Sequence, residues 1–269
     1  MKYAISNIAW NEEHNASVIA LMHEYLFNAV EIAPSKIWSI PLDASKRDII
    51  ACRRYWENNG IEIVAMQALL FDHPELTIFE TNKQRAKTIG YLKRIIDIAN
   101  GLGVQALVFG SPKNRYTNKL PTELINDIAT EFFFTLGEYA ASQNTCLCIE
   151  PNPIEYGCDF VNNSIEASKL VQQVNSPGFG LHLDIAALQM SNENIADVIS
   201  QQANYAKHIH ISEPFLSTLG KGDIDHAKVG NIIMNSDYDK CLSIEMRASE
   251  GNIIESIESS LALVQKHYQ

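Results

Sequence analysis

The sequence lacks any long hydrophobic segment. No apolar run in its 269 residues approaches the about 20 residues that a membrane-spanning helix requires. The first ten residues, MKYAISNIAW, contain one lysine and lack the apolar stretch of a secretory signal peptide. We therefore expect neither a membrane protein nor a secreted one, and we predict that the protein is cytoplasmic.

The cysteines follow no pairing pattern. Their number is five, which is odd, and no two of them form a C-x-x-C motif. They are Cys52, Cys146, Cys148, Cys158 and Cys241. A disulfide framework and a zinc ribbon both depend on paired spacings, so we expect neither, and we expect reduced thiols in a reducing compartment.

Basic residues are scarce relative to acidic ones. Lysine and arginine total 21 against 32 aspartates and glutamates, which gives a formal net charge of -11. Such a charge repels a phosphate backbone at long range, so we expect no nucleic-acid partner. The sequence also lacks Gly/Ser-rich linkers, low-complexity tracts and close repeats, which leaves one domain over residues 1–269 as the simplest organisation.

What the sequence does contain is an alternation of short β-prone segments with longer amphipathic ones. We predict eight strands, at residues 3–8, 29–32, 62–67, 106–109, 146–149, 180–184, 206–211 and 240–245. The clearest helices are predicted at residues 83–102, 121–142, 164–174 and 252–267, where apolar residues recur at a spacing of three and four. Eight such units in one domain predict an α/β fold of the (β/α)8 TIM-barrel class, with an open doubly wound sheet as the alternative.

Local signals mark the ends of these helices. Thr81 and Asn163 precede two of them and are residue types that cap the free amides of a helix N-terminus. The glycine-rich segment GLGV at residues 101–104 follows a predicted helix rather than a strand. We therefore interpret it as a helix C-cap and a turn, and not as a dinucleotide-binding loop.

Four metal-binding residue types fall at the carboxyl ends of the last four predicted strands. They are Glu150 in CLCIEP, Asp184 in GLHLD, His210 in HIHIS and Glu245 in LSIEM. Taken alone, each is more often an ordinary strand-end side chain that caps the next helix or faces water. Together they would lie on the catalytic face of a barrel, where three carboxylates repel one another unless a cation binds between them. Oxygen ligands with one imidazole suit Mn²⁺, Mg²⁺, Co²⁺ or Zn²⁺.

A second polar set lies two positions before the first, so it should face the barrel interior beneath it. Its members are Cys148, His182, His208 and Ser243. His182 and His208 are each more often buried histidines that bond to a neighbour. The alternative is that they orient a metal ligand through a hydrogen bond.

Other side chains near the strand ends are candidates for substrate contact. Lys113, Arg115 and Arg247 predict an anionic group on the substrate, unless they form internal salt bridges. Trp10 and Tyr156, together with Phe215, are aromatic residues on the loops after strands one, five and seven. They predict apolar cavity walls, although aromatic residues also pack loops for stability alone.

Several short motifs together resemble one family. They are VEIAP, VFGSPKNR, CIEPNP, LHLD, HIHISEP, GKGDID and SIEMR, in that order along nearly the whole chain. The chain resembles the xylose isomerase-like TIM-barrel superfamily of sugar phosphate isomerases and epimerases. The steps of 34, 26 and 35 residues between Glu150, Asp184, His210 and Glu245 are similar to those of ketose 3-epimerases, in which the matching residues bind the metal.

The resemblance implies an enzyme that isomerises or epimerises a carbohydrate with a divalent metal, Mn²⁺ before the others. It implies proton abstraction next to a carbonyl through an enediolate, with Glu150 and Glu245 as acid and base. Two departures matter. The D-x-x-H motif of many sugar epimerases is replaced by a segment that ends in Ala187, and Leu216 and Ser217 stand where an arginine is common. The resemblance therefore does not extend to free-ketose specificity.

Other functions remain open on the sequence. A metal-dependent dehydratase of a polyol or keto-sugar uses similar chemistry, and a non-catalytic sugar-binding barrel needs no chemistry. An endonuclease IV-like nuclease is disfavoured by the net charge and by Ala187, which replaces a histidine ligand of that branch, although Asp225 and His226 match a ligand pair of it. The number of subunits is also open, and a homo-oligomer is compatible with the sequence.

Overall fold

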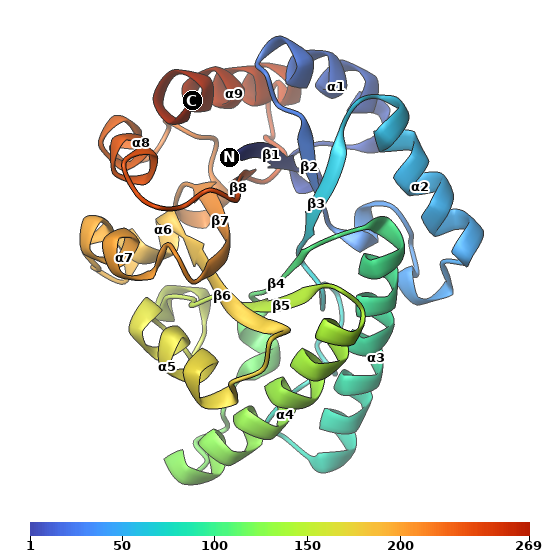
Figure 1. The fold of residues 1–269 in the computed structure, drawn as a ribbon, viewed down its shortest axis with the longest axis vertical. Helices are drawn as coiled ribbons and strands as arrows, with labels where there is room; N and C mark the ends of the chain where they lie inside the picture. The colour runs from blue at the N-terminus through green and yellow to red at the C-terminus, as the bar shows by residue number, and fades with distance from the viewer.

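Eight parallel strands form the centre of the molecule in the computed structural model, which describes residues 1–269. The strands are β1 (Lys2–Ser6), β2 (Ala29–Ile32), β3 (Glu62–Met66), β4 (Ala106–Phe109), β5 (Cys146–Ile149), β6 (Phe179–Asp184), β7 (Ala206–Ser212) and β8 (Cys241–Glu245). Each strand pairs with the next, and β8 pairs with β1 to close the barrel (Figure 1). The prediction of a (β/α)8 barrel is confirmed, and the open sheet is excluded.

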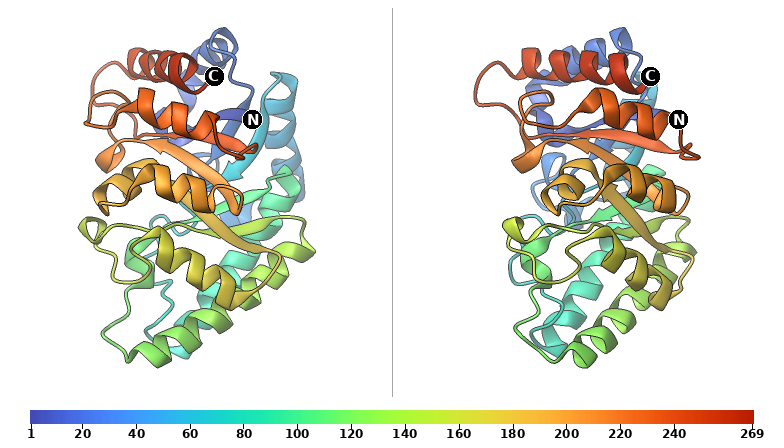
Figure 2. Two further views of the ribbon diagram at one scale, coloured as in Figure 1. Left: turned by 60° about the vertical axis from the view of Figure 1, so that its left-hand side comes forward. Right: turned by 90° about the vertical axis from the view of Figure 1, so that its left-hand side faces the viewer.

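Nine helices surround the strands. They are α1 (Asn15–Glu24), α2 (Lys46–Asn58), α3 (Asn82–Leu102), α4 (Thr122–Ser142), α5 (Ser164–Val174), α6 (Ile185–Met190), α7 (Ile195–Gln202), α8 (His226–Met234) and α9 (Ile253–Tyr268). Figures 1 and 2 show α9 beside α1, so the two ends of the chain complete the outer ring together. No helix combines the length and the apolar character needed to cross a membrane.

The hydrophobic core lies mainly between the barrel and the helices. It contains 65 buried residues in one cluster, and a separate cluster of eight small side chains, chiefly alanine and cysteine, fills part of the barrel interior. The strands are buried on both faces over most of their length, as expected when helices cover a parallel sheet, and such strands are usually apolar throughout. All five cysteines are free thiols. The polar side chains inside the barrel are therefore exceptions that need a reason.

The predicted helix ends are confirmed at three places. The side chains of Thr81 and Asn163 accept hydrogen bonds from the backbone amides of Gln84 and Glu166. Gly103 ends α3 with a φ of 82°, a left-handed conformation that glycine adopts without strain. Seven strands match their predicted ranges to within one residue at each end, and the first strand differs by more. It ends at Ser6 rather than at residue 8, because the Ser6 hydroxyl caps a 3-10 turn at Asn7–Ala9.

Candidate metal centre

The four strand-end residues converge at the carboxyl end of the barrel. Glu150 directly follows β5, Asp184 ends β6, His210 lies in β7 and Glu245 ends β8. One ligand atom from each lies within 4.8 Å of the others. The Nδ1 atom of His210 is 3.3 Å from Glu245 Oε2, 3.7 Å from Glu150 Oε1 and 3.8 Å from Asp184 Oδ2. The barrel thus brings together residues that are up to 95 positions apart in the chain.

The imidazole of His210 lies at the centre of this group of carboxylates. Its Nδ1 is buried and makes no hydrogen bond, although three carboxylates surround it. Its Nε2 lies 3.0 and 3.1 Å from the two carboxylate oxygens of Glu31. Although burial opposes it, the charges of Glu31 and Glu245 raise the pKa of His210 well above its ordinary value, so the metal-free ring carries a proton on each nitrogen. A cation that displaces the Nδ1 proton gains a lone pair that faces three carboxylates. A divalent cation fits this set of three oxygen donors and one nitrogen donor.

Burial and electrostatic repulsion together raise the pKa of two of the three carboxyl groups in this site. Burial, and after it the charges of Glu245 and Glu150, raises the pKa of Asp184 to about 7. Burial also raises the pKa of Glu245. Asp184 is nevertheless held in place, because Oδ1 accepts from the amide of Ala187 and Oδ2 accepts from the hydroxyl of Ser212, both at 2.6 Å. The site therefore fixes carboxylates close together at an electrostatic cost that a cation would remove.

Glycine is required beside one of these carboxylates. A Cβ atom at Gly110 would overlap Glu150 Oε2, so only glycine leaves room for that oxygen. Asn152 Nδ2 donates to the same oxygen at 3.1 Å. The end of β4 and the loop after β5 thus fix the Glu150 carboxylate between them.

Glu31, a completely buried residue of β2, is a further polar residue of this site that was not predicted from the sequence. Besides His210, its carboxylate accepts from Ser243 Oγ at 2.7 Å and lies 3.4 Å from His208 Nε2. Glu31, His208 and His210 form a second group that could hold a metal ion. The available signal was a glutamate in the middle of an otherwise apolar strand, AVEI.

His182, from β6, lies beneath the four strand-end residues and next to Glu150. Its Nε2 atom is 3.4 Å from Glu150 Oε1, and the ring packs edge-on against His210 with 4.1 Å between centroids. Burial, and next the charge of His210, lowers the pKa of His182 to about 3, which keeps the ring neutral. Glu150, His182 and His210 make up a third group of ligand atoms that could hold a metal ion.

A cavity of about 400 Å³ opens above the four strand-end residues. Tyr156 and Phe215 form one wall, with ring centroids 5.6 Å apart, and the Tyr156 hydroxyl accepts from the Phe215 amide at 3.1 Å. Arg247 also lines the cavity. No carboxylate lies within 4.0 Å of its guanidinium, so the internal salt bridge considered for it is not present.

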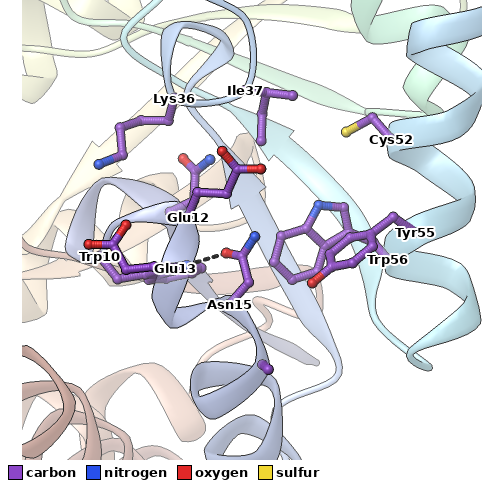
Figure 3. Close-up of a pocket in the computed structure, with 11 residues that line it drawn as sticks. Trp10, Glu12, Glu13, Asn15, Lys36, Ile37, Cys52, Tyr55 and Trp56 are labelled. Carbon is purple, nitrogen blue, oxygen red and sulfur yellow. Dashed lines mark hydrogen bonds between the residues drawn. The ribbon is translucent and has the colours of Figure 1, made fainter.

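Three other predicted substrate residues lie elsewhere. Lys113 is exposed and does not line this cavity. Arg115 is fully buried and does not line the cavity either. Its Nη2 donates to the Glu150 carbonyl at 2.8 Å, and its other two guanidinium nitrogens have no hydrogen-bond partner. Trp10 is also buried, and its Nε1 donates to Asn15 at 2.7 Å. It lines a separate cavity of about 410 Å³ against α2, together with Trp56 (Figure 3).

The residue pair that resembles nuclease ligands has other partners. Asp225 caps α8 by accepting from the Lys228 amide at 3.0 Å. His226 bonds through Nε2 to Glu213 at 3.1 Å and through Nδ1 to the Tyr268 hydroxyl at 2.7 Å. Both ring nitrogens are therefore occupied within the fold, and neither residue belongs to a group that could hold a metal ion.

The raised pKa of Asp184 predicts pH-dependent metal binding. An unfolded chain ionises this group near its ordinary value of 3.8, whereas the metal-free fold holds the proton up to about 7. This proton stabilises the metal-free fold at low pH, and the stabilisation is lost as the pH rises through about 7.

Because Mn²⁺ must displace the proton, saturating Mn²⁺ should raise the melting temperature more at about pH 8 than at about pH 5.5. Thermal melts of wild type and Asp184→Asn check this, since the variant lacks one of the protons that Mn²⁺ displaces and should show a smaller difference between the two pH values. Equal shifts in wild type at both pH values would contradict it.

Comparison with known proteins gives one family. A family model described as xylose isomerase-like TIM barrel matches residues 19–266. L-ribulose 3-epimerase of Methylomonas sp. (strain DH-1) is 25% identical over 115 residues, which is 43% of this chain and 40% of that protein. A Haemophilus influenzae (strain ATCC 51907 / DSM 11121 / KW20 / Rd) protein, named provisionally as L-ribulose-5-phosphate 3-epimerase SgbU, is 24% identical over 97% of this chain and 92% of its own length.

Solved structures agree in fold. D-psicose 3-epimerase with D-tagatose, from Clostridium cellulolyticum H10, matches with a TM-score of 0.82 at 16% identity over 100% of both chains. The IOLI protein with a zinc atom matches with a TM-score of 0.75 at 19% identity, also over 100% of both chains. At these identities the likeness shows the architecture alone.

Proposed function

Since the chain belongs to the xylose isomerase-like TIM-barrel family, we propose that it is a metal-dependent isomerase or epimerase of a sugar or sugar derivative. The observation that carries the proposal is the buried Nδ1 atom of His210, which has no hydrogen-bond partner and lies among the carboxylates of Glu150, Asp184 and Glu245. The names of two relatives, both ribulose 3-epimerases or their 5-phosphate counterparts, support a carbohydrate substrate. We place the reaction in the cytoplasm, in keeping with the free thiols.

The proposed ligands of the metal are Glu150, Asp184, His210 and Glu245. We propose Mn²⁺ first, with Mg²⁺, Co²⁺ and Zn²⁺ as the other ions that suit these donors. When bound, such an ion polarises a sugar carbonyl and acidifies the adjacent C–H bond. Asp184 and His210 then act as ligands alone, because hydrogen bonds from Ser212 and to Glu31 hold them in place.

Glu150 and Glu245 are the proposed proton-transfer groups. They come from β5 and β8, which two other strands separate in the barrel, and each offers an oxygen within 4.8 Å of the other. One carboxylate removes the proton next to the carbonyl on one face of the sugar, and the sugar passes through an enediolate. The other carboxylate returns a proton to the opposite face, which gives epimerisation. Return to the neighbouring carbon gives isomerisation.

A substrate panel tests the proposal. Protein loaded with Mn²⁺ is incubated with ketopentoses, ketohexoses and their phosphates, and products are identified by NMR and mass spectrometry. We expect a product of unchanged mass from at least one substrate, and no product after treatment with EDTA. A product lighter by one water would instead indicate the dehydratase. Protein that binds no metal and converts nothing would support the non-catalytic barrel.

We further propose that the substrate carries an anionic group that binds Arg247. Its guanidinium lines the cavity without an ion pair of its own. Arg247→Ala should raise the KM of a sugar phosphate or sugar acid by about tenfold or more, because a charge-assisted hydrogen bond is lost, and should change kcat less. Steady-state kinetics measure this. Lys113→Ala is the matched control, since Lys113 lies outside the cavity. An unchanged KM in Arg247→Ala would remove this part of the proposal.

A further inference from the structure

We propose that Glu31 is the positioning residue of the metal centre. Its buried carboxylate holds the His210 ring so that Nδ1, and not Nε2, faces the carboxylates of Glu150 and Glu245. This inference rests on the proposed metal dependence and adds a residue that touches neither metal nor substrate. Glu31 comes from β2, which β1 and β8 separate from β7, the strand of His210.

The contacts of Glu31 converge from two other strands. Both of its oxygens lie within hydrogen-bond distance of His210 Nε2, at 3.1 and 3.0 Å. The Ser243 hydroxyl donates to Oε2 at 2.7 Å, and His208 Nε2 lies 3.4 Å from the same oxygen. No lysine or arginine lies within 4.0 Å of this carboxylate, so its bonds come from imidazoles and a hydroxyl.

A buried glutamate at this position lowers the stability of the fold unless other groups bind its carboxylate. The side chain is 0% exposed, and its neighbours in the strand, Val30 and Ile32, are apolar and equally buried. An aliphatic residue would pack there without the desolvation cost of a carboxylate, which is several kcal/mol or more for a charge left without partners. The only imidazole nitrogen within 3.1 Å of Glu31 belongs to the histidine that faces the metal centre.

The bond from Nε2 to Glu31 has two physical effects on His210. It fixes the tautomer, because a proton on Nε2 leaves the lone pair on Nδ1, and it fixes the rotation of the ring about its axis. A carboxylate acceptor also makes Nδ1 more basic, and partners of this kind typically contribute about 10 to 100-fold to metal affinity. His182, packed edge-on at 4.1 Å between centroids, limits the ring from another side.

The test compares metal affinity in Glu31→Gln and in a matched control. Glutamine keeps the size of the side chain and removes its charge, so we expect Mn²⁺ affinity to fall by about 10 to 100-fold by calorimetry. Ser243→Ala is the control, because it removes a bond to the same carboxylate and keeps the bond between that carboxylate and His210. We expect its affinity to stay within about threefold of wild type, since the charge of Glu31 and its bond to His210 remain.

A spectroscopic readout separates positioning from a general structural effect. In protein labelled with ¹⁵N-histidine and loaded with ¹¹³Cd²⁺, we expect the metal to couple to Nδ1 of His210 and a proton to reside on Nε2. In Glu31→Gln the Nε2 proton should exchange faster and the coupling should weaken. If Glu31→Gln does not fold, Glu31→Asp replaces it, because the shorter carboxylate keeps the charge and withdraws from His210.

The outcomes are distinguishable from a failure of the proposed function. Wild-type protein that binds no metal would overturn both. One ion per chain, coupled to Nδ1, with unchanged affinity in the Glu31 variant, would overturn the positioning role alone. Two ions per chain, one of them lost in Glu31→Gln, would also overturn it, because Glu31, His208 and His210 would then be ligands of a second metal.

Discussion

Replacement of Asp184 by asparagine is expected to lower Mn²⁺ affinity by about two orders of magnitude or more, because it removes the charge of a direct ligand. Asparagine keeps an oxygen that can accept from the Ala187 amide, so the start of α6 should remain intact. His210→Ala should cause a loss of similar size by removing the one nitrogen donor. Isothermal titration and metal content after dialysis measure both effects.

The two variants should differ in stability. Burial, and after it the charges of Glu245 and Glu150, raises the pKa of Asp184 to about 7. Asp184→Asn removes this unfavourable charge, so the metal-free variant should melt no lower than wild type at neutral pH. His210→Ala leaves the buried Glu31 carboxylate without its nearest imidazole, which should cost about 1–3 kcal/mol or more. Asp225→Asn, at the N-cap of α8, is the control for a carboxylate outside the centre. Unchanged metal occupancy in both ligand variants would contradict the site.

The glutamates should show a different pattern, in which metal binding survives and turnover fails. Glu150→Gln and Glu245→Gln each keep side-chain volume and one coordinating oxygen but lose the basic oxygen. We expect kcat to fall by roughly 100-fold or more in each, the size of a typical general acid-base contribution. Metal content should stay above that of Asp184→Asn. Kinetics at saturating Mn²⁺ separate lost chemistry from lost metal.

Incorporation of deuterium from heavy water tests the roles of the two glutamates more directly than steady-state kinetics. Wild type in heavy water should place deuterium on the carbon next to the carbonyl, unless the proton is shielded and returned directly. A variant that keeps one glutamate should still exchange hydrogen at that carbon, while forming little product, because one face retains its base. Wild-type turnover in both glutamine variants would disprove the two-carboxylate mechanism, even with an intact metal site.

The polar residues at the strand ends could be found from the sequence because topology alone places them. Once strands are parallel and alternate with helices, their carboxyl ends share one face, so Glu150, Asp184 and Glu245 fall together whatever the loops do. Loop residues have no such constraint. Arg115 and Trp10 lie on loops after β4 and β1, and the turns there bury both side chains away from the cavity.

Glu31 shows why the polar residues inside the barrel could not all be predicted from the sequence. In an amphipathic strand the alternation of apolar and polar residues reveals which side chains face the core, but both faces of β2 are buried. Its pairing with β3 also shifts register between Val30 and Glu31. The direction of a single side chain cannot then be derived from its neighbours in the sequence.

The sequence by itself determined the order of strands and helices, the barrel class and the residues on its carboxyl face, because these depend on local hydrophobic spacing and on the rules of parallel connection. Only the tertiary structure decided which polar groups meet inside the barrel. Glu31 lies 177 residues from His208 and 212 from Ser243, and closure of the barrel places all three in contact. Hydrogen bonds over such separations depend on strand register and tilt, which no local pattern specifies.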